Sequence, residues 1–183
     1  MQSKTELRKF AKDLRKTLNI KEISEKILQI FIKSDEYKTA KNIALYYPYA
    51  NELDLTLLFK FTEEKNFFLP KITQTGSLSF HNYKNGDTLI ENKFGILEPQ
   101  SEAINSNIID LIIIPALMAD KSGYRLGYGK GYYDKFFAEN NLSTKKIICV
   151  PEELLTQTLP HDAWDIPSNT IITQKILYHI RQI

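Results

Sequence analysis

The segment from residue 120 to residue 134 combines the residue types of a phosphate-binding loop. Four of the chain's seven glycines stand in it, together with Arg125 and Lys130. Glycines let backbone N–H groups approach phosphate oxygens closely, and the two side chains add full positive charge. The apolar run 108–115 precedes the segment and a helical pattern, 132–140, follows it. This order predicts an anion site, because a helix N-terminus adds positive dipole.

The segment does not match either common nucleotide-binding motif. A Walker A loop needs Ser or Thr after its lysine, whereas Lys130 precedes Gly131. The dinucleotide fingerprint leaves two residues before its third glycine, whereas Gly127, Gly129 and Gly131 alternate. The alternative is a plain flexible turn, but such a turn seldom carries Arg, Lys and several Tyr at this density.

Residues 3–18 predict an amphipathic helix whose basic stripe could reach the same anion. Ser3 is the expected N-cap, and Glu6 completes a capping box. Lys4 and Arg8 lie one turn apart and could converge on a phosphate, with a solvated basic face as the alternative. The apolar face is formed by Leu7, Phe10, Ala11, Leu14 and Leu18.

The remaining pattern alternates strands with helices. Helices are expected over 21–33, 55–65 with Asp54 as N-cap, 132–140, and from Thr173 to Ile180. Strands are expected over 43–47, 67–69 before Pro70, 78–83 at the periphery, the apolar run 108–115, 146–150 and 170–172. Uniformly apolar central strands predict an α/β fold, a three-layer α/β/α arrangement with a mostly parallel central sheet. The loops after Tyr47, Leu69, Ala116 and Val150 should share one rim, where ligands bind in such folds.

A resemblance supports the anion site. The run Gly123-x-Arg125-Leu126-Gly127-x-Gly129-Lys130-Gly131-Tyr132-Tyr133-Asp134 resembles the signature of the 5-formyltetrahydrofolate cyclo-ligases, and further family segments occur in order from Lys4 to about Thr173. The resemblance implies conversion of 5-formyltetrahydrofolate to 5,10-methenyltetrahydrofolate, with ATP as co-substrate and Mg²⁺ as cofactor. Two alternatives are a different ATP-dependent kinase or ligase on this scaffold, and a non-catalytic nucleotide-binding module.

The resemblance also implies roles for individual residues. ATP would be bound by Lys4, Arg8, Arg125, Leu126, Gly127, Tyr128, Gly129, Lys130, Gly131, Tyr132 and Tyr133, with Lys130 and Arg125 as the catalytic residues. Folate would be bound by Tyr47, Glu52, Phe94 and Tyr132. Mg²⁺ would be held by Asp134, which could otherwise simply complement a helix dipole, and by Asp165. Leu55 stands where the family usually has Thr, and Asn169 where it often has Asp.

Composition limits the other possibilities. The 183 residues carry a net charge of +2, too little to indicate nucleic-acid binding, and the one cysteine, Cys149, lies in an apolar run. His81, His161 and His179 lack metal-ligand spacing, and no apolar run is long enough to cross a membrane. We therefore expect one domain over 1–183, a cytoplasmic monomer that binds small molecules.

Overall fold

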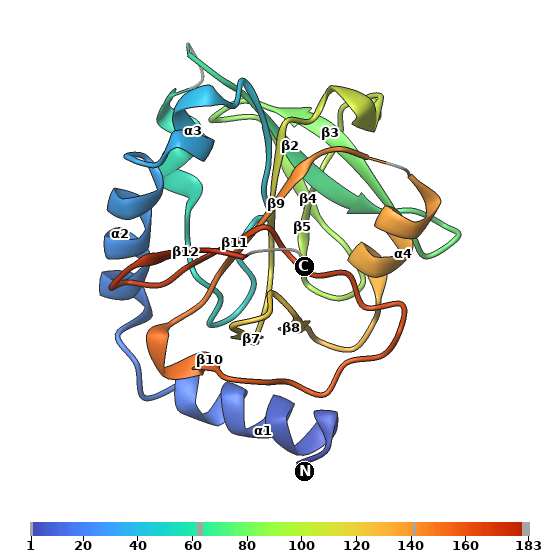
Figure 1. Cartoon of the computed structure of the whole chain (residues 1–183). Coiled ribbons are helices and arrows are strands. Elements are labelled where there is room, and N and C mark those ends of the chain that lie inside the picture. Colours follow the sequence, from blue (N-terminus) through green and yellow to red (C-terminus); the bar gives the residue numbers. More distant parts are fainter. Residues whose placement is uncertain (1, 62–63, 141, 181–183) are drawn as a thin grey trace.

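The computed structural model describes residues 2–61, 64–140 and 142–180 and is built around a seven-stranded sheet (Figure 1). The strand order is β12-β11-β9-β6-β1-β2-β3. The five inner strands pair in parallel, and β3 and β12 close the two edges in antiparallel orientation. The described residues thus form the expected mostly parallel sheet, which lies between helices.

The chain forms the following helices and strands in order. They are α1 (Lys4–Arg15), α2 (Ile20–Phe31), α3 (Asp35–Thr39), β1 (Asn42–Ala44), the 3₁₀ helix η1 (Thr56–Phe61), β2 (Asn66–Ile72), β3 (Leu78–Tyr83), β4 (Leu89–Glu91), β5 (Leu97–Pro99), η2 (Ser106–Ile108), β6 (Leu111–Ile114), β7 (Met118–Asp120), β8 (Arg125–Leu126), α4 (Tyr132–Glu139), β9 (Lys145–Cys149), η3 (Glu152–Leu154), β10 (Leu155–Thr156), β11 (Thr170–Ile172) and β12 (Leu177–His179).

The central strands are buried on both faces, which explains their unbroken apolar sequence. Side chains alternate along a strand, so Leu111 and Ile113 of β6 enter one core while Ile112 and Ile114 enter the other. The first core packs against α2, α3 and η1, and the second against α4. These helices lie on opposite sides of the sheet (Figure 1). The three-layer α/β/α prediction is confirmed.

A third core joins α1 to a small sheet of strand order β10-β7-β8. Ala11 of α1 is fully buried against this group, with Leu7 and Leu14 packed beside it. Helix α1 begins as predicted, because Ser3 and Glu6 form the capping box. Phe10 is an exception to the predicted apolar face, since it is 50% exposed. Only the narrow stripe through Leu7, Ala11 and Leu14 packs against the small sheet.

The carboxylate of Asp120 fixes the turn that opens the glycine-rich segment. Its Oδ1 accepts hydrogen bonds from the backbone N–H groups of Ser122 (2.9 Å) and Tyr124 (3.0 Å), and its Oδ2 accepts one from Leu159 (2.8 Å). Asp120 is only 2% exposed. One buried carboxylate therefore joins the turn after β7 to the loop after β10.

Two helix predictions are wrong. The expected helix 55–65 is the 3₁₀ helix Thr56–Phe61, and residues 62 and 63 lie outside the described part of the chain. Asp54 still caps its start, accepting from the N–H of Thr56 at 2.8 Å. The expected closing helix 173–180 is instead a turn followed by β12, which pairs with β11. Its apolar spacing suits a helix, but the segment instead pairs along the sheet edge, where β11 supplies backbone partners.

The strand predictions hold with changed ends. The edge strand β3, β11 and the central strands β6 and β9 lie where expected, whereas β1 ends at Ala44. Pro70 does not end β2, which continues to Ile72. The reason is that β1 pairs only with residues 66–68, so the missing N–H of Pro70 removes no bond from that ladder. No helix in the described ranges has the length and apolar character needed to span a membrane.

Replacing Asp120 should destabilise the fold strongly. Asp120→Ala leaves three backbone donors without their acceptor, so we expect a loss of about 3 kcal/mol in the free energy of unfolding, measured by urea denaturation. Asp13→Ala is the matched control, because Asp13 pairs only with exposed Lys9 and Lys16 and should change stability by less than about 0.5 kcal/mol. Equal losses in both variants would contradict this role.

Candidate active site

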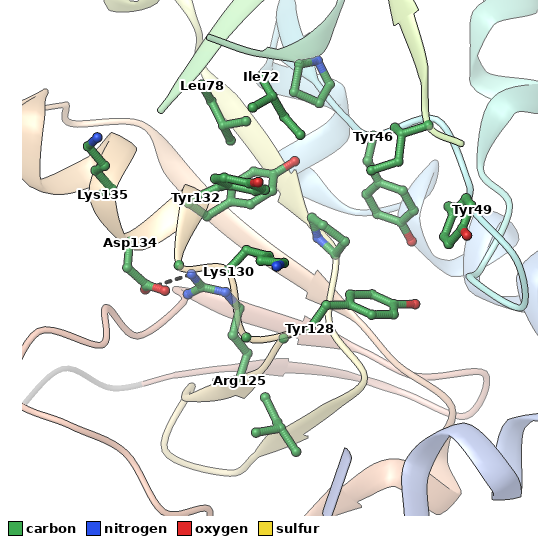
Figure 2. Close-up of a pocket in the computed structure, with 18 of the residues that line it drawn as sticks. Tyr46, Tyr49, Ile72, Leu78, Arg125, Tyr128, Lys130, Tyr132, Asp134 and Lys135 are labelled. Atoms are coloured by element: carbon green, nitrogen blue, oxygen red, sulfur yellow. Dashed lines mark hydrogen bonds and ion pairs between the residues drawn. The ribbon is translucent and has the colours of Figure 1, made fainter. Parts of the chain in front are cut away.

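A cavity of about 820 Å³ lies beyond the carboxyl ends of the parallel strands. The segment after β1 contributes Tyr46, Tyr47 and Glu52, while Pro70 comes from β2 and Pro115 follows β6. This is the predicted rim, except that the residues directly after Val150 do not line the cavity. Figure 2 shows Tyr128, Lys130 and Tyr132 around it, whereas Lys135 turns away.

The glycine-rich segment forms one end of this cavity, which we call the cationic end. Every residue from Arg125 to Lys135 lines the cavity. The Arg8 guanidinium lies against the segment, its Nε donating to the carbonyl of Gly127 at 3.0 Å. Gly129 has φ +95°, and a Cβ there would lie 3.2 Å from Arg8 Cζ. The backbone conformation at 129 therefore favours glycine, and the approach of Arg8 leaves little room for a side chain.

Helix α4 points its N-terminus toward the same end. Gly131 is the N-cap residue, and it provides no side chain to cap the first N–H groups. Lys130 precedes it and points into the cavity between Tyr128 and Tyr132 (Figure 2). Uncapped N–H groups beside a lysine favour an anion.

Arg125 is held at the cationic end of the cavity by two hydrogen bonds. Its Nη2 donates to Asp134 Oδ1 at 2.7 Å, and its Nη1 donates to the carbonyl of Ile166 at 3.0 Å. Its side chain is only 7% exposed. The N–H of Ile166 also donates to Asp134 Oδ1, at 3.3 Å. These bonds connect the glycine-rich segment, α4 and the loop 159–168, which we call the C-terminal loop.

The C-terminal loop is tied to α1 by Lys4. The ammonium of Lys4 lies 2.6 Å from Asp162 Oδ2 and 2.8 Å from Asp165 Oδ2. Burial alone would lower the pKa of Lys4, but the hydrogen bonds and charges of the two carboxylates outweigh it and raise the pKa. Burial likewise opposes ionisation of Asp165, but Lys4 and the N–H of Asp162 lower its pKa overall. Lys4 thus offsets one of the two negative charges of the loop.

Gly123 shows how tightly the C-terminal loop packs on the glycine-rich segment. Its φ is +93°, and an added Cβ would lie 2.9 Å from the carbonyl oxygen of Ser168. The backbone of Ser168 donates to the carbonyl of Gly123 at 2.9 Å. No other residue type fits this contact without moving the loop.

Glu52 marks the opposite end of the cavity. Its carboxylate accepts from the N–H of Tyr49 at 2.9 Å. Burial raises the pKa of Glu52, and the Tyr49 bond, the Tyr128 hydroxyl and the charge of Arg15 offset part of that rise. Burial and the Glu52 charge in turn raise the pKa of Tyr128. Tyr47 and Phe94 line the cavity too, and Lys130 Nζ lies 6.0 Å from the Phe94 ring centroid, so aromatic rings extend from the carboxylate toward Lys130.

The structure brings together all the predicted site residues. Those expected at ATP, folate or metal all line this cavity. Asp134 and Asp165 both face it, although each is already paired with a cation, and the described residues contain no cluster of three or more His, Cys, Asp or Glu that could hold a metal. Tyr132 and Tyr133 both line the cavity, and the hydroxyl of Tyr133 is buried without a hydrogen-bond partner in the described structure.

Sequence reasoning missed Arg15. It is 3% exposed, and it donates to the carbonyls of Asn51 (3.1 Å), Ala116 (2.6 Å) and Leu117 (3.2 Å). It therefore ties the segment carrying Glu52 to the one entering the small sheet. The available signal was its place in the basic stripe of α1, which a solvated face explains equally well.

The cysteine and the three histidines do not line the cavity, and each makes contacts within the fold. Burial raises the pKa of Cys149 to about 12. His81 is buried between Ser79 Oγ (2.8 Å) and the carbonyl of Ser101 (2.6 Å). His161 stacks on Tyr124 with ring centroids 3.7 Å apart. His179 lies 3.1 Å from Glu36. These contacts fit the structural roles expected for the histidines.

Comparison with known proteins decides the family. The sequence profile of the 5-formyltetrahydrofolate cyclo-ligase family matches residues 1–174. The chain belongs to this family. A 5-formyltetrahydrofolate cyclo-ligase of Haemophilus influenzae is 31% identical over 176 residues, covering 91% of this chain and 92% of that protein. The Escherichia coli K12 protein of the same name is 28% identical over 142 residues, covering 73% and 78%.

Solved structures agree with the cyclo-ligase assignment. The NMR structure of Aquifex aeolicus 5,10-methenyltetrahydrofolate synthetase has a TM-score of 0.86 and 35% identity, covering 98% of this chain and 93% of that one. The Mycoplasma pneumoniae 5,10-methenyltetrahydrofolate synthetase has a TM-score of 0.75 and 26% identity, covering 94% and 99%. The cyclo-ligase fold thus extends over nearly the whole chain.

Glu52 should cost this cyclo-ligase stability at neutral pH. Because burial raises its folded-state pKa, stability from the protonated carboxyl is present below the unfolded pKa and is lost as pH rises through the folded one. Glu52→Gln keeps the shape without the charge. It should raise the melting temperature at about pH 7 and have little effect at about pH 4. Glu102→Gln, at an exposed position, is the control; the same pH dependence in both variants would refute the buried-charge explanation.

Proposed function

We propose that this protein uses ATP to convert 5-formyltetrahydrofolate to 5,10-methenyltetrahydrofolate, with release of ADP and phosphate. The observation that carries the proposal is the polarity of the cavity. Its cationic end, with Lys130 and Arg125, and its carboxylate end, at Glu52, face one cavity of about 820 Å³. A phosphoryl donor and a flat heterocycle can therefore meet inside it.

The chemistry implied by the family needs positioning more than reactive side chains. The formyl oxygen attacks the γ-phosphorus and ADP leaves, which gives a phosphorylated iminium. N10 then attacks the formyl carbon and gives up its proton, the C–O bond breaks, and phosphate departs with that proton as the ring closes. Protein groups must hold the two substrates and stabilise charge on the transferring phosphoryl group.

The cationic end divides this work between a fixed and a movable cation. Arg125 is anchored by Asp134 and Ile166 and can only hold phosphate oxygens that come to it. Lys130 is exposed and lies between two glycines, so it can follow the phosphoryl group during transfer. Lys4, Arg8 and the backbone from Leu126 to Tyr133 would bind the rest of the triphosphate.

The other end would bind the folate. The edge of a pterin offers adjacent N–H donors, which a carboxylate such as Glu52 can accept together. Tyr47, Phe94 and Tyr132 offer rings for stacking against the flat ring systems. Burial of Glu52 strengthens such bonds when the carboxylate is ionised.

Asp134 and Asp165 are the residues we propose for Mg²⁺. Their carboxylates are the hard oxygen donors that Mg²⁺ prefers, and Ile166, one residue after Asp165, donates to Asp134, so both donors lie at one end of the cavity. When bound, the ion would neutralise charge on the phosphates. Lys4 and Arg125 now satisfy these carboxylates, and Lys4 can turn to the phosphates instead, whereas Arg125 stays in place.

The proposal includes the setting in which the enzyme works. We propose a single-domain cytoplasmic monomer acting on small molecules, without nucleic-acid or membrane partners. The rival functions, another ATP-dependent kinase or ligase and a nucleotide-binding module, leave the aromatic end around Glu52 without a purpose.

The function is tested by mixing purified protein with ATP, Mg²⁺ and 5-formyltetrahydrofolate. Methenyltetrahydrofolate, followed by its absorbance, and ADP should appear in equal amounts, and chelation of Mg²⁺ should stop both. ATP consumption without cyclised folate would indicate the rival kinase or ligase. ATP binding without turnover would indicate the nucleotide-binding module.

Lys130→Ala should lower kcat about a hundredfold with little change in folate affinity, because it removes one donor to the transferring phosphoryl group. Lys121→Ala is the control, since Lys121 is an exposed lysine of the same segment that does not line the cavity. Steady-state kinetics of both variants at two ionic strengths provide the measurement. A Lys130→Ala enzyme within about threefold of wild type at both would remove Lys130 from the mechanism.

A further inference from the structure

Trp164 is an exposed aromatic residue with no function assigned so far. It is the chain's one tryptophan, and it is 71% exposed. It also lines the cavity. An indole exposed at the edge of a binding cavity is a large apolar surface that a flat ligand can cover.

The backbone around Trp164 is held in place. The N–H of Asp165 donates to the carbonyl of Asp162 at 3.0 Å, and the N–H of Asp162 donates to Asp165 Oδ2 at 2.8 Å. Trp164 lies inside this turn, and Lys4 binds the carboxylates on both sides of it. The indole is therefore carried by a fixed turn at the cationic end.

The other exposed aromatic residues that line the cavity have contacts of their own, and the Phe94 ring centroid lies 6.0 Å from Lys130 Nζ. Tyr49 donates its N–H to Glu52, and the pKa of Tyr128 is raised by burial and by the charge of Glu52. Phe94 follows Asn92, whose side chain accepts from its N–H in the turn between β4 and β5. Trp164 instead flanks the carboxylates that Lys4 binds.

We propose that Trp164 stacks on the base of the nucleotide. This rests on the proposed function insofar as the cationic end binds a nucleoside triphosphate. With the phosphates against Arg125 and the glycine-rich segment, the base must lie farther out, toward the mouth of the cavity. Trp164 is at that mouth, next to Lys4, and offers a π-face rather than hydrogen bonds. It should favour purines over pyrimidines, because a larger ring system covers more of the indole.

Binding measurements that separate the base from the phosphates test this proposal. Calorimetry would compare a non-hydrolysable ATP analogue, the matching UTP analogue and inorganic tripolyphosphate, which has no base. Trp164→Ala should raise the Kd of the ATP analogue about tenfold, that of the UTP analogue less, and that of tripolyphosphate not at all. Trp164→Phe should restore most of the affinity. Ile108→Ala, an exposed apolar residue away from the cavity, should change none of the values.

The folate arm identifies the opposite result. The Kd of 5-formyltetrahydrofolate should be the same in wild type and Trp164→Ala. If it rises while that of the ATP analogue is unchanged, or if tripolyphosphate binding falls as much as binding of the ATP analogue, the proposal is wrong. These measurements involve no turnover, so an inactive enzyme that showed the expected nucleotide pattern would refute the proposed reaction and retain the role of Trp164.

Discussion

The basic stripe of α1 holds the site together. Lys4 binds the C-terminal loop, Arg8 binds the carbonyl of Gly127, and Arg15 binds the carbonyls of Asn51 and Ala116. Lys12 lies 5.5 Å from the ring centroid of Tyr128. Segments more than a hundred residues apart are thereby fixed to one rigid helix, whose own position is set by the apolar stripe through Ala11. The same stripe supplies the cations that would bind a polyphosphate.

The charged groups at the two ends of the cavity differ in whether they have ion-pair partners. At the cationic end, Arg125 and Lys4 are neutralised by Asp134, Asp162 and Asp165, which keeps a dense cluster of charge stable before any ligand binds. At the other end Glu52 forms no such ion pair with any residue that the structure describes, and burial raises its pKa. Ligand binding can exchange partners at the first end and supply the missing ones at the second. The buried carboxylate of Glu52 therefore lowers the stability of the fold at the end of the cavity where we expect a neutral, hydrogen-bonding ring to bind.

The sequence predicted those features that local physics decides. The capping box at Ser3, the two-sided burial of β6 and the glycine-rich turn before α4 each follow from residue type and spacing. The errors arise where distant contacts prevail. Pro70 continues β2 because β1 has ended, and Leu177 pairs along an edge instead of joining a helix. Arg15 and Asp120 were missed because their partners are backbone groups, which leave no pattern in the sequence.

The contacts of Asn169 explain why position 165, and not position 169, presents its side chain to the cavity. Its Oδ1 accepts from the N–H of Lys146 at 2.8 Å, and its backbone joins β9 and the residue Ile180. It does not line the cavity, whereas Asp165 does. The side chain at 169 thus completes the junction of β9 and β11, while the turn at 162–165 presents its carboxylates to Lys4. In this chain the proposed metal site can take its second carboxylate from the turn, because the strand position is already used to hold the sheet.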